Sequence, residues 1–248
     1  MRFGLSAAAC SAILLLSTAP ALAVGPAHSY SLDGTLADAL GGPSLSLVNG
    51  ATLGASGVSF DAGQGLALTS AAFADSHVYS IGLDFSFSSL QNYNRIINSN
   101  GVDAGLYIHG SFAPVVDYYH FGAYDGGAFS VGDMHHLLFT RDDDGISVYL
   151  DGNNVLNTAP FSSSVITSSS VLFFVDDQSE NAPGFVSSIC TYNSKLSASD
   201  AAALGGGSCA VSGNSGAVPE PASWTMLVGG FGLVGAAVRR RRSSVAFS

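Results

Sequence analysis

Basic side chains are scarce in this 248-residue chain, which has 8 Lys plus Arg against 18 Asp plus Glu. Five of the eight basic residues lie at the two ends, at residue 2 and residues 239–242. Residues 24–219 therefore contain 17 acidic and 3 basic side chains, so their formal charge is −14. Because nucleic acids and anionic lipid headgroups are bound by clustered Lys or Arg, we expect no nucleic-acid partner. Cations and neutral glycans remain candidates.

Glutamate and lysine are also rare, with 2 Glu and 1 Lys in the whole chain. Charged residues make up 10% of the sequence and hydrophobic residues 47%, which excludes a disordered polyelectrolyte and a coiled coil. The 30 Gly, 15 Phe and 9 Tyr favour turns and strands, while strong surface helix formers are few. The composition predicts an all-β protein with a sizeable core.

The N-terminus has the features of a secretory signal peptide. Arg2 precedes an apolar run through Leu16, and the run is followed by Ala21-Leu22-Ala23, a small-x-small pattern that signal peptidase accepts. We therefore expect residues 1–23 to be removed by signal peptidase. The alternative is a lipoprotein acylated at Cys10, although the apolar run continues past that cysteine.

Only two cysteines remain after this cleavage, Cys190 and Cys209. An even pair in a chain exported to an oxidising compartment predicts a disulfide. The bridge would close a loop of roughly 20 residues, for which the chain-entropy model gives about 3 kcal/mol. Two unpaired thiols are the alternative, since Cys209 lies in a Gly-rich stretch.

The C-terminus combines a short motif, an apolar segment and a basic end. Residues 222–238 would form a helix about 25 Å long, near the lower limit for crossing a bilayer. The four arginines after it should stay cytoplasmic, and Trp224 suits the outer interface. From these residues alone, the segment is either a transient span or a permanent single-span anchor.

Three ordered elements resemble the PEP-CTERM sorting signal of Gram-negative bacteria. They are the motif Pro219-Glu220-Pro221 with Trp224, the apolar Gly-rich segment, and the basic cluster Arg239, Arg240, Arg241 and Arg242. The resemblance covers residues 218–242, with Thr225 where the commonest pattern has Ala, and leaves residues 243–248 as a tail. It implies processing by an exosortase, a membrane protease, with a transient inner-membrane intermediate. The product would then reach the cell surface or extracellular matrix.

Residues 24–205 are predicted to form one β-sandwich, followed by a Gly/Ser-rich linker at 206–217. Short apolar or alternating segments recur about every ten residues between turn clusters. The clearest strands are 78–87 and 146–150, and the second should turn back at Asp151-Gly152 into a hairpin. One short terminal helix is expected at 197–204, because Ser197 is a good N-cap.

Four stretches of this body resemble laminin G-like, or concanavalin A-like, jelly-roll domains. They are residues 30–38, 58–63, 134–152 and 188–197, and the hairpin at 134–152 is the strongest match. Met134 stands where relatives usually have Trp, and Ser187-Ser188 where they often have an Asp-Glu pair. The resemblance implies a two-sheet antiparallel jelly-roll sandwich.

Catalytic motifs are not found, so we expect no enzyme. A glycosidase needs two carboxylates flanking the scissile bond, and the only glutamates are Glu180, in a loop, and Glu220, in the sorting signal. No Gly-x-Ser-x-Gly elbow is present, and His135-His136 on one strand would point to opposite faces. A hydrolase that uses an aspartate pair is the least favoured function.

Two kinds of binding site are suggested by residue type. Calcium accepts oxygen ligands from loops, and the candidates, which could also be solvated turn residues, are Asp33, Asp38, Asp176 and Asp177. Glycan sites combine aromatic rings with amides or carboxylates. The candidates, which compete with a role in core packing, are Tyr93, Asn94, Tyr118, Tyr119 and Tyr124.

Together these features predict an exported, surface-sorted, non-catalytic binding protein of the bacterial extracellular matrix or biofilm. Its expected ligand is exopolysaccharide or another surface glycan, and calcium is the one candidate cofactor. The competing hypothesis is an adhesive or structural matrix protein that binds protein partners.

Overall fold

The computed structural model describes residues 24–101, 103–110, 115–118, 129–176, 180–204 and 209. The predicted signal peptide and sorting signal lie outside these residues, and so does the predicted linker except for Cys209. Within the described part of the chain, no helix has the length and apolarity needed to cross a membrane. The predicted transmembrane helix therefore stays a prediction.

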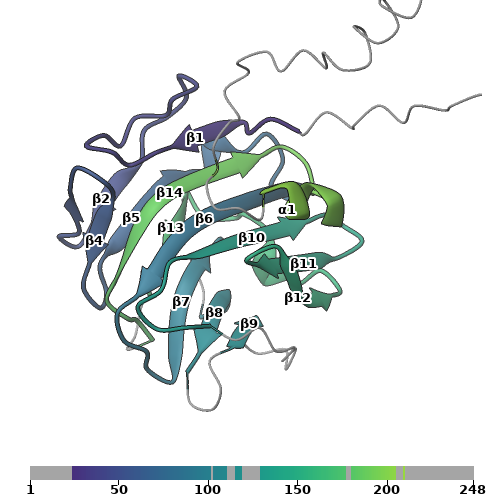
Figure 1. Ribbon diagram of the computed structural model, residues 1–248. Helices are drawn as coiled ribbons and strands as arrows, with labels where there is room; N and C mark the ends of the chain where they lie inside the picture. Colours follow the sequence, from purple (N-terminus) through teal and green to yellow (C-terminus); the bar gives the residue numbers. More distant parts are fainter. Residues whose placement is uncertain are drawn as a thin grey trace, which may run out of the picture.

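Two antiparallel sheets pack face to face, as the sequence predicts (Figure 1). The eight-stranded sheet runs in the order β12 (Asn153–Thr158), β11 (Ile146–Leu150), β10 (His135–Arg141), β6 (Tyr79–Phe87), β14 (Gly184–Tyr192), β4 (Val58–Phe60) and β3 (Thr52–Leu53), with β1 (His28–Tyr30) also paired to β14. The six-stranded sheet runs β2 (Ser46–Val48), β5 (Gly65–Thr69), β13 (Ser170–Phe173), β7 (Tyr93–Asn98), β8 (Leu106–His109) and β9 (Val115–Tyr118). The described residues also form three short helices, η1 (Ser70–Ala72), η2 (Ser162–Ser164) and α1 (Ala198–Leu204).

Strand β6 shows why this sequence forms a sandwich. Its odd-numbered side chains, from Tyr79 to Phe87, all belong to the core between the sheets. The intervening residues, among them Asp84, lie on the outer face, because successive strand side chains alternate. The predicted strand at 78–87 is confirmed. Its period of two places one set of side chains in the core and the other set on the outer face of the sheet.

Five phenylalanine rings fill one end of this core. Phe174 stacks on Phe60 with ring centroids 4.4 Å apart, and it also lies 5.4 Å from Phe85 and 5.9 Å from Phe87. Phe129 completes the group, 5.8 Å from Phe85. These rings connect β4 and β6 to the segment that crosses from β13 to β14.

Strand β14 pairs with three other strands of the eight-stranded sheet. Along one edge it pairs with β6 over nearly its whole length. Its other edge is divided, because residues 184–186 pair with β4 and residues 189–191 pair with β1. A register irregularity between Val186 and Ser188 separates the two halves.

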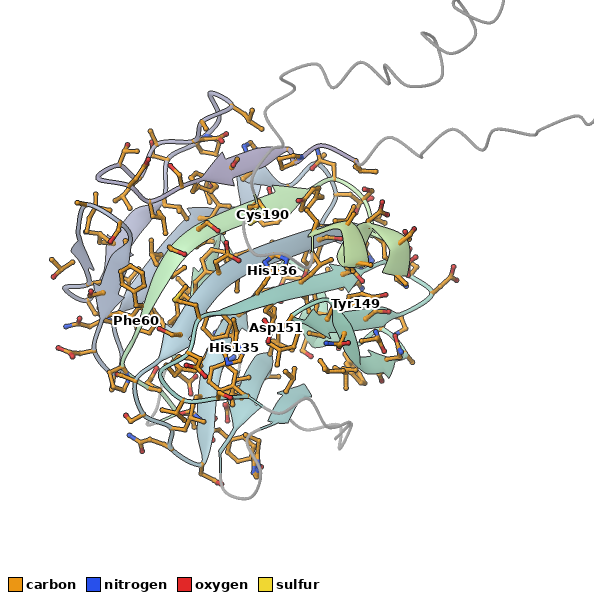
Figure 2. All side chains as sticks on the ribbon, in the orientation of Figure 1. Phe60, His135, His136, Tyr149, Asp151 and Cys190 are labelled. Carbon is orange, nitrogen blue, oxygen red and sulfur yellow. A yellow bond between two sulfur atoms is a disulfide. The ribbon has the colours of Figure 1, made fainter. Side chains whose placement is uncertain are left out.

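The predicted hairpin connects β11 and β12 through Asp151 and Gly152, whose φ values are 51° and 78°. The Asp151 carboxylate accepts a hydrogen bond from the backbone N–H of His136 at 2.9 Å and lies 2.7 Å from Nδ1 of His135. His136 instead bonds Asp84 through Nδ1 at 2.7 Å. The two histidines therefore point to opposite faces of β10, as expected (Figure 2).

A second apolar cluster covers the outer face of the eight-stranded sheet, beneath α1 (Figure 1). The predicted disulfide joins Cys190 of β14 to Cys209, with their Cα atoms 5.4 Å apart, and lies over Gly82. The predicted helix is also present, and Ser197 and Asp200 bond each other reciprocally at its N-terminus. The cluster comprises Leu138, Tyr149, Cys190, Tyr192, Leu196, Ala201 and Cys209.

Hydrogen bonds to the Asp38 side chain hold the N-terminal strand, β1, against the domain. The Asp38 carboxylate accepts hydrogen bonds from the backbone N–H groups of Ser29 at 2.8 Å, Leu40 at 3.1 Å and Gly42 at 2.8 Å. It also lies 2.7 Å from Nδ1 of His28, the first residue of β1. Burial alone would raise the pKa of Asp38, but the hydrogen bonds outweigh burial and lower it below its ordinary value.

We predict that Asp38→Ala lowers the free energy of unfolding by about 2–4 kcal/mol at neutral pH, because buried donors lose their acceptor. A carboxyl with a lowered pKa stabilises the fold above its unfolded pKa, and this stability is lost as the pH falls through the folded value. The difference between wild type and variant should therefore shrink below about pH 4.

Urea unfolding across a pH series measures this effect, with Asp33→Ala as the matched control because Asp33 is exposed. Equal losses from the two variants would contradict the assignment of Asp38 as a structural clamp.

Candidate ligand-binding face

Aromatic side chains gather on the outer face of the six-stranded sheet. Leu106 and Ile108 of β8 belong to the core, so Tyr107 and His109 point to the opposite side. Tyr93 of β7 lies beside both, with ring centroids 4.5 Å from His109 and 6.0 Å from Tyr107. Tyr107 and His109 are buried, whereas Tyr93 is partly exposed. The face thus presents one partly exposed ring, Tyr93, which packs against the buried rings of Tyr107 and His109.

Arg95 is the fully buried cation of this face. Its guanidinium lies 4.5 Å from the centre of the Tyr107 ring and donates to the backbone oxygen of Ala104 at 2.9 Å. One nitrogen also donates to the Asp176 carboxylate at 2.5 Å and lies 3.7 Å from that of Asp103. Burial of this charge is tolerated because acidic partners accompany it.

Glu180 adds a third carboxylate. Oxygens of Asp103, Asp176 and Glu180 lie within 4.8 Å of one another, and in the described part of the chain this is the one group of three acidic, histidine or cysteine ligands that could hold a metal ion. The backbone oxygen of Glu180 accepts from Arg95 N–H at 3.0 Å. Burial raises the pKa of Glu180 and the charges of Asp103 and Asp176 raise it further, against the opposing effects of Arg95 and Tyr107.

The structure brings together some of the residues proposed from the sequence and separates others. Asp176 belongs to the acidic group, but Asp33 and Asp38 do not. The Asn94 amide is buried and bonded to the backbone of Gln91 and Ile108, so Tyr93 is the exposed member of that pair. Tyr118 ends β9, next to β8. Its side chain, and Tyr119, Tyr124 and Asp177, lie outside the described residues.

Sequence reasoning missed Asp103, Tyr107 and Glu180 as site residues, and it considered Arg95 only as part of the stretch 91–95 that could line a binding face. One signal was available, because Arg95 is one of only three basic residues in the body and precedes two isoleucines in a strand. A buried arginine requires acidic partners. The partners themselves come from segments distant in sequence, since Arg95 and Asp176 are 81 residues apart.

The carboxylates of this group differ in their exposure to solvent. The Asp176 side chain has no exposed surface and is held by Arg95. The Asp103 side chain, by contrast, is 46% exposed. Because Tyr93 and Asp103 both adjoin Tyr107, a ligand can meet an aromatic ring and a carboxylate together.

Residues 217–242 match the family model described as the PEP-CTERM protein-sorting motif. This match confirms the sorting signal predicted at 218–242. It implies that the chain is exported and sorted as a substrate of an exosortase. No curated protein matches the chain.

The fold is similar to those of several solved structures. Trypanosoma rangeli sialidase matches 72% of the chain with a TM-score of 0.59 and 20% identity, and the match spans 32% of the sialidase. Domain 4 of AbnA, a GH43 extracellular arabinanase from Geobacillus stearothermophilus solved in complex with arabinotriose, matches 74% of the chain over its own full length, with a TM-score of 0.57 and 18% identity. The receptor binding domain of a botulinum neurotoxin C/D mosaic serotype matches 73% of the chain and 51% of its own length, with a TM-score of 0.54 and 12% identity. These likenesses confirm the jelly-roll sandwich.

We predict that Glu180→Gln stabilises the protein at neutral pH, by about 1–3 °C in Tm. A carboxyl whose pKa is raised by folding carries no penalty while protonated, and stability is lost as the pH rises through the raised value. Gln keeps an acceptor for Tyr107 but removes the repulsion from Asp103 and Asp176.

Thermal unfolding at pH 4 and pH 7 tests this prediction. The variant should match wild type at the lower pH and exceed it at the higher one. A variant that is equally or less stable than wild type at pH 7 would show that Glu180 is not under electrostatic strain.

Proposed function

We propose that this is an exported, surface-sorted, non-catalytic protein that binds polysaccharide of the extracellular matrix of a Gram-negative bacterium. The observation that carries the proposal is the partly exposed Tyr93 ring, which packs against Tyr107 and His109. The Tyr107 hydroxyl in turn donates to the exposed carboxylate of Asp103. An aromatic ring packs against sugar CH groups, and carboxylates accept hydrogen bonds from sugar hydroxyls.

The charge of the body favours the same class of ligand. With 17 acidic and 3 basic side chains in residues 24–219, the protein repels strongly anionic polymers. A neutral polysaccharide meets no such repulsion. The sorting signal adds support, because it directs the chain to the compartment in which matrix polysaccharides lie. The strong hairpin resemblance, with His135, His136 and Asp151 in place, supports the finer laminin G-like assignment.

Calcium is the cation that we assign to Asp103, Asp176 and Glu180. The three carboxylates offer the hard oxygen ligands that calcium prefers, and a divalent ion would offset the repulsion that raises the pKa of Glu180. Arg95 already neutralises part of this charge, so the ion would share Asp176 with the guanidinium. Asp38 suits a metal less well, because backbone N–H groups already donate to its carboxylate oxygens.

A glycoside hydrolase is the alternative that the acidic group raises, since Asp176 and Glu180 lie close together and the pKa of Glu180 is raised. The complete burial of the Asp176 side chain argues against it, because a nucleophile or base must reach the sugar or its attacking water. The proposal therefore assigns these carboxylates to ligand and cation binding.

We expect Glu220→Ala to abolish sorting in the producing bacterium, because the Pro-Glu-Pro motif is the part that the exosortase would recognise. The chain should then keep its C-terminal segment and stay in the inner membrane, as measured by immunoblotting of cell fractions. Thr225→Ala is the matched control and should sort normally. Normal surface delivery of the Glu220 variant would disprove exosortase processing.

We expect purified full-length chain in mild detergent to co-sediment saturably with exopolysaccharide from the same bacterium. Tyr93→Ala should weaken binding by about tenfold or more, because it removes the exposed ring. Tyr93→Phe keeps the ring and should retain most of the affinity. Repeating the titration in calcium and in EDTA tests the assigned cation, which predicts tighter binding in calcium.

Absence of binding in both buffers would overturn the glycan proposal. Specific capture of a matrix protein by the same purified chain would then favour the adhesive or structural function. Release of soluble sugar from the polymer, lost in Glu180→Gln, would instead favour the hydrolase.

A further inference from the structure

A polar cleft, separate from the face that carries Tyr93, lies at the end of the sandwich where β4, β6 and β14 meet. It has a volume of about 290 Å³, close to the lower end of the range for small-ligand pockets. Phe60, one of the lining residues, marks this end of the molecule in Figure 2. The lining residues are Gly50, Thr52, Ser59, Phe60, Asp61, Gln64, Ser88, Pro183 and Gly184.

The lining of the cleft is mostly polar, with two apolar residues, Phe60 and Pro183. Thr52, Ser59, Asp61 and Ser88 are exposed and supply three hydroxyls and a carboxylate. The Gln64 side-chain oxygen is occupied, since it accepts from Asp61 N–H at 3.0 Å, which leaves its NH₂ group as the available donor. These donors and acceptors, together with the apolar groups of Phe60 and Pro183, suit a sugar ring.

Two glycines of the lining occupy positions that do not suit a larger residue. Gly50 has φ +93°, a conformation that other residues rarely adopt. At Gly184, an added Cβ would lie only 2.2 Å from the Ser86 oxygen and 2.8 Å from the Phe60 ring. A side chain is thus excluded at two positions of the lining.

Two neighbouring segments connect the cleft to the Tyr93 face. Ser88 bonds Pro183 through its backbone N–H at 2.9 Å, and Arg95 bonds Glu180 in the same way at 3.0 Å. The segment 88–95 therefore passes from β6 of one sheet to β7 of the other and is bonded to residues 180 and 183, so it leads around the end of the sandwich from the cleft to the Tyr93 face. Tyr93 is five positions after Ser88, so their Cα atoms lie at most about 18 Å apart.

We propose that the cleft is a second saccharide subsite and that, together with the Tyr93 face, it binds one extended oligosaccharide segment of a polymer. This inference rests on the proposed function and specifies its ligand as a chain several sugars long. A ligand that fills both subsites gains affinity, because its second contact is intramolecular once the first has formed.

The test uses size fractions of partially hydrolysed exopolysaccharide from the producing bacterium, titrated into the full-length chain by calorimetry. We expect long fragments to bind about 100-fold more tightly than the shortest binding fragments. The double variant Asp61→Asn/Ser59→Ala should abolish this gain and leave the affinity for the shortest fragments unchanged.

Asp144→Asn is the matched control. Asp144 is an exposed turn residue near the start of β6, whereas the cleft lies at its end, so the variant should keep the gain. Unchanged Tm values show that each variant is folded.

The outcomes separate the two proposals. If wild type shows no gain with length, or if the double variant keeps it, the second subsite is disproved and polysaccharide binding stands. If no fragment of any length binds to wild type, both the proposed function and the second subsite are disproved.

Discussion

The stacking of Phe174 on Phe60 is the contact on which the candidate sites depend. Phe174 has φ +65°, which is unfavourable for a bulky residue and costs about 1–3 kcal/mol. Its ring is fully buried among the core phenylalanines, and burial of such a side chain contributes about 1.5–3 kcal/mol. Burial of the ring thereby offsets the cost of this backbone conformation, which lies two residues before Asp176. The Asp176 side chain and the Glu180 backbone oxygen both bond Arg95, and Pro183 lines the polar cleft.

The sequence predicted features that depend on local patterns. Alternation along residues 78–87 located β6, because one strand face must be buried. Turn residues at Asp151-Gly152 located the hairpin, and Ser197 located the helix start, since both depend on chemistry within a few residues. The export context predicted the disulfide, and the ordered C-terminal elements predicted the sorting signal.

Contacts between distant segments could not be predicted in this way. Tyr107, Asp103, Asp176 and Glu180 converge on Arg95 only after β7, β8 and β13 have paired, and no local spacing encodes that meeting. Asp38 shows the opposite difficulty. It is a residue type that commonly binds calcium. The glycines after it, however, let the backbone turn so that its N–H groups donate hydrogen bonds to the Asp38 carboxylate. Residue type alone did not distinguish these two uses of an aspartate.

The position of the disulfide has a mechanical consequence for a protein held by its C-terminal end. Tension applied beyond Cys209 passes through the bridge to Cys190 and so bypasses α1, which would otherwise peel away first. The load enters β14 between β6 and β1, where Cys190 pairs with Gly82 and Ser29. Many backbone hydrogen bonds then share the force, because a pull on the C-terminal end acts on a strand that is paired along both edges.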